Sequence, residues 1–354
     1  MKTRQVNARA EELLKSALVC DMTLPWEGSY SDEDITLPKF KSAHVDFISL
    51  TVAARGNDMH STVESIARIT AHIRERSEQM ILVDTVEDIL AAKHAGKLAL
   101  GFNLQETLPF EENIAFVDVF YRLGVRHALL AYNLRNLVGD GCAERTDAGL
   151  SRFGIDLVRE MNRVGMIVDG THSGYRTTME AMEVCSSPFI FSHSNAHAVW
   201  PHYRNIRDDQ IKACAKSAGV VGINGLGTFL GEGESLAELI FAHIDYISTL
   251  VGPEHVGIGL DYVRDAKAFS DWVEINPNMW PSSKDGEAPI GSEFAQPEVL
   301  ANVVALMLER QYSEGNIRDI LGGNFLRVAR QVWKPSPDQA SGARENAPMN
   351  VGLS

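Results

Sequence analysis

The chain has 354 residues, of which 45% are hydrophobic and 23% charged, a balance typical of folded globular proteins that excludes a disordered chain. Asp and Glu outnumber Lys and Arg by 47 to 33, so the formal net charge is -14, and without a basic cluster nucleic acid is excluded as the expected partner. No apolar run approaches the ~18 residues of a membrane-spanning helix, so no membrane segment is predicted and a small molecule is the expected ligand.

Eight short runs of apolar and β-branched residues are predicted to form strands. In chain order they are residues 17–21, 45–52, 98–102, 127–131, 166–169, 189–192, 220–224 and 256–260. Runs such as VVGI are apolar throughout, which favours strands buried on both faces of a parallel sheet. Segments of helical periodicity, for example residues 59–73 and 150–164, lie between them.

This alternation predicts an α/β fold, a single closed (β/α)8 TIM barrel. Eight strand–helix units over about 250 residues match the usual size of that fold. A doubly wound sheet is less favoured, because no GxGxxG motif opens a helix. The barrel domain is expected to span residues 1–333.

Two stretches interrupt the alternation. Residues 262–296 form a long loop after the last predicted strand, either an active-site lid or an insertion without a functional role. Residues 334–354 are rich in Pro, Ser, Gly and Asn and are predicted to be disordered or to contact a neighbouring subunit.

The cysteines and the N-terminus indicate a compartment. The four cysteines are scattered without CxxC spacing: Cys20, Cys142, Cys185 and Cys214. This pattern is not typical of a disulfide framework or a zinc knuckle. Because the N-terminal residues also lack the apolar stretch of a signal peptide, we expect a cytoplasmic location.

Polar residues at the ends of the predicted strands are the candidates for chemistry, because barrel enzymes place their active sites there. They are Asp21, Asn103, Tyr132, Asp169, His172, His193, Asn224 and Asp261. His172 and His193 follow consecutive strands, and neighbouring strands lie only ~5 Å apart. Two such imidazoles either bind one metal ion or form a hydrogen-bonded pair that lines the barrel mouth.

Asp261 and Arg204 each allow more than one interpretation. Asp261 ends the strand GIGLD, where a carboxylate serves as a metal ligand, as a general base or as a cap on the following loop. Arg204, in HYRNIRDD, either binds a substrate carboxylate through two parallel hydrogen bonds or pairs with Asp208 or Asp209 on the surface.

Residues 120–261 resemble the membrane dipeptidase family, also called peptidase family M19. The resemblance rests on FYRLGVRHALLAYN, GLSRFGIDLVREMNRVGMIVDGTHS, FIFSHSNA, YRNIRDD and HVGIGLDY, in the family's order. It implies a (β/α)8 barrel of the metal-dependent amidohydrolase kind, dipeptide hydrolysis at a two-zinc centre, and a homodimer. It also implies that His172 and His193 bind one metal, that Arg204 binds the substrate carboxylate, and that Asp261 manages the proton of the attacking water and the leaving amine.

Three positions depart from the family pattern. The first strand normally carries a His-x-Asp pair, but VCDMTLPW places either Asp21 and Thr23 or Thr23 and Pro25 in those positions. GFNLQET puts Asn103 where the family has a bridging glutamate, and Tyr132 replaces a histidine. Because these changes remove ligands of the second ion, we expect zinc or another divalent metal as one ion or none, with Asp21 as a tentative ligand beside His172 and His193.

The expected activity is hydrolysis of an amide bond in a dipeptide or another small substrate that carries a carboxylate. Asp261 is the expected catalytic residue, and Arg204, Tyr132 and Asn103 are the expected substrate-binding residues. Because the metal ligands are altered, we expect ordinary dipeptides to be hydrolysed weakly or not at all. Two alternatives keep the same barrel: a lyase, isomerase or demethylating enzyme acting on an amino acid derivative, and a non-catalytic binding protein.

Overall fold

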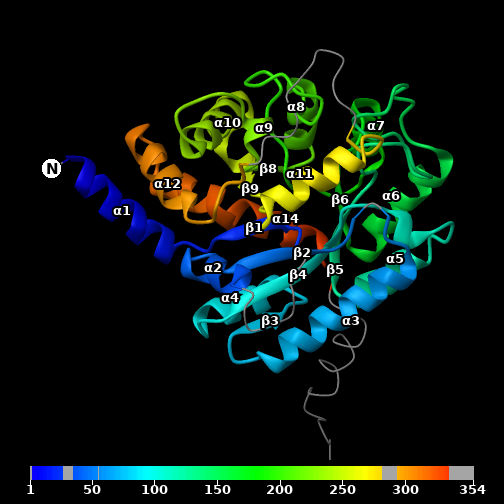
Figure 1. The fold of residues 1–354 in the computed structure, drawn as a ribbon, viewed down its shortest axis with the longest axis horizontal. Coiled ribbons are helices and arrows are strands. Elements are labelled where there is room, and N and C mark those ends of the chain that lie inside the picture. Colours follow the sequence, from blue (N-terminus) through cyan, green and yellow to red (C-terminus); the bar gives the residue numbers. More distant parts are fainter. Residues whose placement is uncertain (1, 27–34, 55, 281–292, 335–354) are drawn as a thin grey trace, which may run out of the picture.

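The computed structural model describes residues 2–26, 35–54, 56–280 and 293–334. Within them, parallel strands form one sheet in the order β1-β2-β4-β5-β6-β7-β8-β9, and β3 pairs with β4 (Figure 1). The strands are β1 (Cys20–Leu24), β2 (Phe47–Ala53), β3 (Met80–Leu82), β4 (Leu98–Leu104), β5 (Val125–Leu129), β6 (Ile167–Asp169), β7 (Ile190–Phe191), β8 (Val220–Ile223) and β9 (Val256–Ile258). β9 also lies against β1, so the sheet nearly closes and the predicted (β/α)8 barrel is confirmed.

Helices connect the strands and surround the barrel (Figure 1). They are α1 (Lys2–Ser16), α2 (Thr36–Ser42), α3 (Met59–Glu75), α4 (Val86–His94), α5 (Phe116–Arg122), α6 (Arg152–Val164), α7 (Tyr175–Val184), α8 (Asp208–Lys216), α9 (Gly227–Leu230), α10 (Leu236–Val251), α11 (Ala266–Ile275), α12 (Val299–Glu309), α13 (Glu314–Arg318) and α14 (Asn324–Val332). None of the described helices is both long and apolar enough to cross a membrane.

Helix α6 shows how local sequence sets these elements. Its N-cap, Ser151, accepts a hydrogen bond from the backbone N–H of Gly154, and its last turn ends at Gly165. Gly165 has a φ of 96°, in the left-handed region where a side chain would be strained. Leu157 and Met161 are buried on the face toward the barrel, as the apolar spacing predicts.

Three strands differ from the sequence prediction: β1, β3 and β5, of which β5 begins and ends two residues earlier than predicted. The first strand is Cys20–Leu24 rather than residues 17–21, because the apolar residues just before it continue from the buried face of α1. β3 is not predicted at all. It has three residues, and the central one, Ile81, is half exposed, so periodicity alone does not separate it from the surrounding helical segments.

The barrel interior is apolar at the end where the strands start. Phe47, Ile167, Ile190 and Val220 belong to one buried cluster with Phe325 of α14. The rings of Phe47 and Phe325 stack with their centroids 5.5 Å apart. This end of the barrel is therefore filled by packed side chains.

A buried polar layer follows along the same strands. Ser49 Oγ lies 2.8 Å from His127 Nε2, and His127 Nδ1 lies 3.1 Å from Asp169 Oδ2. Asn103 Nδ2 donates to the Ser49 carbonyl and hydroxyl at 3.0 and 3.1 Å. The order Ser49, His127 and Asp169 resembles the nucleophile, base and acid of a catalytic triad. However, Ser49 is 1% exposed and does not line the cavity described below. We assign this layer to fixing β2, β4, β5 and β6 relative to one another.

Candidate active site

The ends of β6 and β7 bring the two candidate histidines together. The imidazole centroids of His172 and His193 are 5.1 Å apart, well within the ~10 Å that shared binding of one ion allows. Asp169 ties the two turns that carry them, because its Oδ1 accepts backbone N–H groups from both Thr171 and Ser192 at 3.0 and 3.1 Å. A single buried carboxylate thus sets the relative position of both histidines.

Both histidines are neutral. Burial lowers the pKa of His193 to about 4 and lowers the pKa of His172 well below 6.5. His193 Nδ1 lies 2.8 Å from Ser192 Oγ, whereas its Nε2 is buried without a hydrogen-bond partner. In the tautomer whose Nδ1–H donates to Ser192 Oγ, the unpartnered Nε2 has a lone pair available for a ligand.

His172 is oriented by Asn133, a residue that the sequence did not single out. Asn133 Oδ1 lies 2.6 Å from His172 Nδ1. The other ring nitrogen, Nε2, takes no part in this contact. The Asn133 side chain also donates through Nδ2 to the Met279 carbonyl at 3.0 Å. One fully buried amide therefore connects His172 to the chain segment that precedes Trp280.

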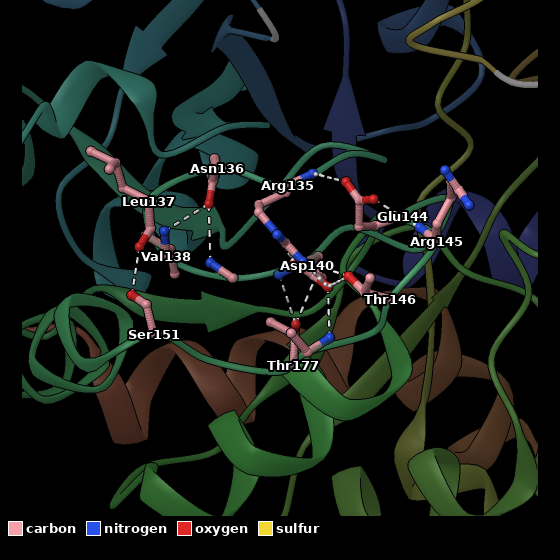
Figure 2. A network of polar contacts seen from close by, with 12 residues as sticks. Arg135, Asn136, Leu137, Val138, Asp140, Glu144, Arg145, Thr146, Ser151 and Thr177 are labelled. Carbon is pink, nitrogen blue, oxygen red and sulfur yellow. Dashed lines mark hydrogen bonds and ion pairs between the residues drawn. The ribbon is translucent and has the colours of Figure 1, made fainter.

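The loop that carries Asn133 is held by its own polar network (Figure 2). Arg135 Nε donates to Asp140 Oδ1 at 2.5 Å, and Thr146 and the Ala148 N–H donate to the second carboxylate oxygen. The Arg135 guanidinium holds the pKa of Asp140 below its usual value. Because a charged hydrogen-bonded carboxylate fixes the loop at several points, Asn133 is presented in a defined orientation.

Arg204 is 3% exposed, and its Nε and Nη2 have no hydrogen-bond partner. Its guanidinium carbon lies 5.1 Å from the ring centroid of Phe229. Asp208 and Asp209, its alternative partners, accept hydrogen bonds from Tyr246 and Tyr175 instead. The structure therefore places a buried cation with unused donors beside the histidines, an arrangement that suits an anionic ligand.

Tyr132 and Asp261 complete the mouth of the barrel. The Tyr132 ring stacks on His172 with centroids 4.0 Å apart, and burial raises the pKa of Tyr132, so its hydroxyl stays protonated. Asp261 has a φ of 55° and accepts a hydrogen bond from Asn224 Nδ2 at 3.1 Å. Its carboxylate is only partly buried and lines the cavity described below.

Asp21 and its neighbour Thr23 are both buried in β1. Asp21 Oδ1 accepts the backbone N–H groups of Thr23 and Leu260, whereas its Oδ2 and the Thr23 hydroxyl are buried without partners. Burial raises the pKa of Asp21 to about 7. Asp21 and Thr23 thus each keep one buried side-chain oxygen without a partner.

The remaining donors do not add a metal site. Asn103 uses its amide on Ser49 and on Thr51, whose hydroxyl donates to Asn103 Oδ1 at 3.1 Å. Glu106 is buried and accepts the Thr107 N–H at 2.9 Å. Within the described residues no three His, Cys, Asp or Glu side chains form a metal-binding group. The unpartnered His193 Nε2 fits a ligand role, as does the buried and unpartnered Asp21 Oδ2.

A cavity of about 490 Å³ opens beside Asp261. Its lining residues are Pro25, Trp26, Thr36, Ala54, Asn57, Gln105, Tyr132, Leu226, Asp261, Tyr262, Val263, Arg264, Asp265, Ala268, Phe269, Trp272, Trp280 and Phe294. Half of these come from the predicted loop 262–296, which contains helix α11 across the middle of the view in Figure 1. Residues 281–292 of that loop and residues 335–354 of the predicted tail lie outside the described residues.

A pH dependence of stability follows from His243, which supports the turn after His193. His243 Nδ1 accepts the Ala196 N–H at 3.1 Å, and burial lowers the pKa of His243 from 6.5 to about 4. The unfolded chain therefore binds this proton first, and stability is lost as the pH falls from about 6.5 toward 4. Between about pH 7.5 and about pH 5 we expect His243 to account for roughly 2 kcal/mol of the lost unfolding free energy.

Urea unfolding of wild type and His243→Gln at the two pH values measures this contribution. The variant is expected to be less stable at both values but to lose about 2 kcal/mol less on acidification. The exposed His60 provides the control, because His60→Gln should keep the wild-type pH dependence. An unchanged pH dependence in His243→Gln would contradict the assignment.

Comparison with known proteins adds to this geometry. A family model described as membrane dipeptidase, peptidase family M19, matches residues 15–275. The dipeptidase tcpJ of Claviceps purpurea is 29% identical over 278 residues, which cover 77% of this chain and 60% of that protein. The chain thus spans less than two thirds of that relative.

Solved structures show the same architecture. An amidohydrolase from Pseudomonas aeruginosa is 30% identical, with a TM-score of 0.81 over 92% of this chain and 99% of that chain. A metallopeptidase from Rhodobacter sphaeroides, solved with a phosphinate mimic of the dipeptide L-Ala-D-Ala, has a TM-score of 0.75 at 19% identity, over 90% of this chain and 99% of that chain. At that identity the likeness shows the fold alone.

Proposed function

Because the chain belongs to the membrane dipeptidase family, peptidase family M19, we propose that it hydrolyses an amide bond in a dipeptide-like substrate that carries a carboxylate. The observation that carries this proposal is Arg204, a buried cation whose unpartnered donors lie beside two neutral histidines and Asp261. A substrate carboxylate bound to Arg204 would compensate the buried positive charge of its guanidinium. The amide bond next to that carboxylate would then lie beside His172 and His193.

Each residue has a separate role in this proposal. Arg204 binds the substrate carboxylate and sets its orientation. Asp261 accepts a proton from the attacking water and delivers it to the leaving amine, a task that suits its partly exposed carboxylate. The hydroxyl of Tyr132, which stays protonated, donates a hydrogen bond to the substrate. Asn103 acts through the polar layer, since its amide is already bonded to Ser49 and Thr51.

His172 and His193 are the residues that would hold a divalent metal. Asp21, the tentative third ligand predicted from the sequence, would offer its Oδ2. A zinc ion bound there would polarise the substrate carbonyl and lower the pKa of bound water. The chain's own contribution is to keep both rings neutral and oriented, through Asn133 on one side and Ser192 on the other.

We expect at most one tightly bound metal ion per chain. Two histidines without a bridging carboxylate do not supply the ligands or the charge that a second dication requires. Elemental analysis of protein purified without chelators gives the number of ions per chain, and His193→Ala should reduce it further. Two zinc ions per chain, retained through dialysis, would show that Asp21 or Glu106 supplies ligands where we assign none.

Turnover assays test the activity itself. Wild-type protein, with and without added zinc, is incubated with a panel of dipeptides and N-acylated amino acids, and the released amine is quantified. Release of amine that is lost in Asp261→Asn supports the proposal. Chemistry on the same compounds without amide cleavage would favour a lyase or isomerase, and binding without any reaction would favour a binding protein. A homodimer and a cytoplasmic location stay predictions.

A further inference from the structure

We infer that the cavity beside Asp261 receives a large apolar or aromatic side chain from the acyl half of the substrate, the half on the far side of the scissile amide from the carboxylate. The inference rests on the proposed function, because Arg204 defines the carboxylate end. It adds a substrate class: dipeptide-like molecules with a bulky apolar residue on the amino-terminal side.

The cavity has the size and walls for such a group. Its volume of about 490 Å³ lies within the ~300–1,000 Å³ of small-molecule sites. Seven of its 18 lining residues are aromatic: Trp26, Tyr132, Tyr262, Phe269, Trp272, Trp280 and Phe294. Because an apolar group gains free energy when it leaves water for such a surface, the walls select for apolar area.

Trp280 connects the cavity to the carboxylate site. Its ring centroid lies 5.8 Å from those of both Tyr132 and His172, and it stacks on Phe229 at 6.3 Å. Phe229 is also the ring against which the Arg204 guanidinium packs. The rings of Phe229 and Trp280 therefore link Arg204 to the cavity wall, and we place the two ends of one dipeptide at these two points.

The orientation follows from which residues line the cavity. Asp261, the group assigned to the scissile bond, lines it, whereas Arg204 does not. The substrate carboxylate is placed at Arg204 and the scissile amide at Asp261. The substrate atoms on the far side of that amide belong to the acyl half. Their side chain therefore enters the cavity.

The lining residues contact one another. Phe269 of α11 makes edge-to-face contacts with Trp280 and Phe294, with centroids 6.0 and 5.6 Å apart. Asn133 holds the segment before Trp280 through the Met279 carbonyl. A preorganised pocket loses little entropy on binding, so the apolar contact is expressed as affinity.

The test compares Phe-Gly with Gly-Phe and Gly-Gly, which share charges but place the ring on different halves or omit it. Three of the five tryptophans line the cavity, so tryptophan fluorescence reports binding without requiring turnover. Burial of the ring should make the Kd of Phe-Gly roughly 10-fold to 100-fold lower than that of Gly-Gly. Gly-Phe should not show this gain, because its ring lies on the carboxylate half.

Ala268→Leu fills part of the cavity from α11 and should remove most of the preference for Phe-Gly while leaving the Kd of Gly-Gly within a few-fold. Leucine has nearly the helix propensity of alanine, so the helix is kept. The matched control is Glu274→Leu, an exposed position on the same helix that does not line the cavity. It should behave as wild type, and thermal melting verifies that both variants are folded.

The outcomes separate this inference from the proposed function. Equal Kd values for the three dipeptides, a gain for Gly-Phe that equals that for Phe-Gly, or a preference that survives Ala268→Leu would each overturn the cavity assignment, even if amide hydrolysis is observed. Selective binding of Phe-Gly without hydrolysis of any amide would support the cavity assignment and reject the proposed function. Failure of Phe-Gly to bind overturns the inference.

Discussion

Arg204→Met is expected to weaken the binding of carboxylate ligands by roughly 30-fold to several thousand-fold, equivalent to ~2–5 kcal/mol. Methionine keeps much of the apolar stem but lacks the guanidinium, which lies over Phe229 and carries the planar fork of donors. The effect should depend on the ligand's charge. Wild type should therefore prefer Phe-Gly to its C-terminal amide, whereas Arg204→Met should bind both with similar Kd, measured by calorimetry.

Arg207→Met is the matched control for this change. Arg207 lies three residues away and packs its guanidinium 5.1 Å from the Tyr175 ring centroid, the same separation as Arg204 from Phe229, but it is exposed. Its loss should leave the preference for the carboxylate unchanged. If Arg204→Met retains the wild-type preference, Arg204 does not contact the ligand.

Asp261→Asn is expected to lower kcat by roughly 10²–10⁴-fold, the usual contribution of a general acid–base residue. Asparagine has the same shape and tolerates the positive φ of 55° at this position, so the loop geometry should be kept. Because the carboxylate is assigned to proton transfer rather than to binding, the Kd of the substrate should change far less than kcat. Stopped assays of amine release and fluorescence titrations give the two quantities.

Asp265→Asn is the control for charge in the cavity wall. Asp265 also lines the cavity, and its carboxylate caps α11 by accepting the Ala268 N–H at 2.9 Å. Asparagine is an equally good N-cap, so this variant removes a nearby negative charge without altering the helix. A loss of kcat as large as that of Asp261→Asn would indicate a general electrostatic effect instead of proton transfer by Asp261.

The fold could be predicted because its signals are local. Alternating apolar runs and amphipathic segments encode strand and helix separately, and features such as Ser151 and Gly165 mark where α6 begins and ends. In a parallel barrel the chain order of the strands becomes their order in space. His172 and His193 could therefore be predicted as neighbours, because they follow consecutive strands at the same end of the barrel.

The surroundings of these candidates required the tertiary structure. Whether Arg204 pairs with Asp208 or stays buried depends on Phe229 and on tyrosines from other helices. No short-range pattern identifies Asn133 either. Its importance comes from a hydrogen bond to Met279, 146 residues away, and from its contact with His172.

By itself, the sequence determined the barrel, the end of the barrel that carries the site, and the residue types presented there. Only the tertiary structure decided which of those residues remain unsatisfied, such as Arg204 and His193 Nε2, and which are used internally, such as Asn103. The physical reason is that secondary structure follows from apolar periodicity within about ten residues. The burial and pairing of a polar group depend instead on segments from several strands and helices that meet only when the chain folds.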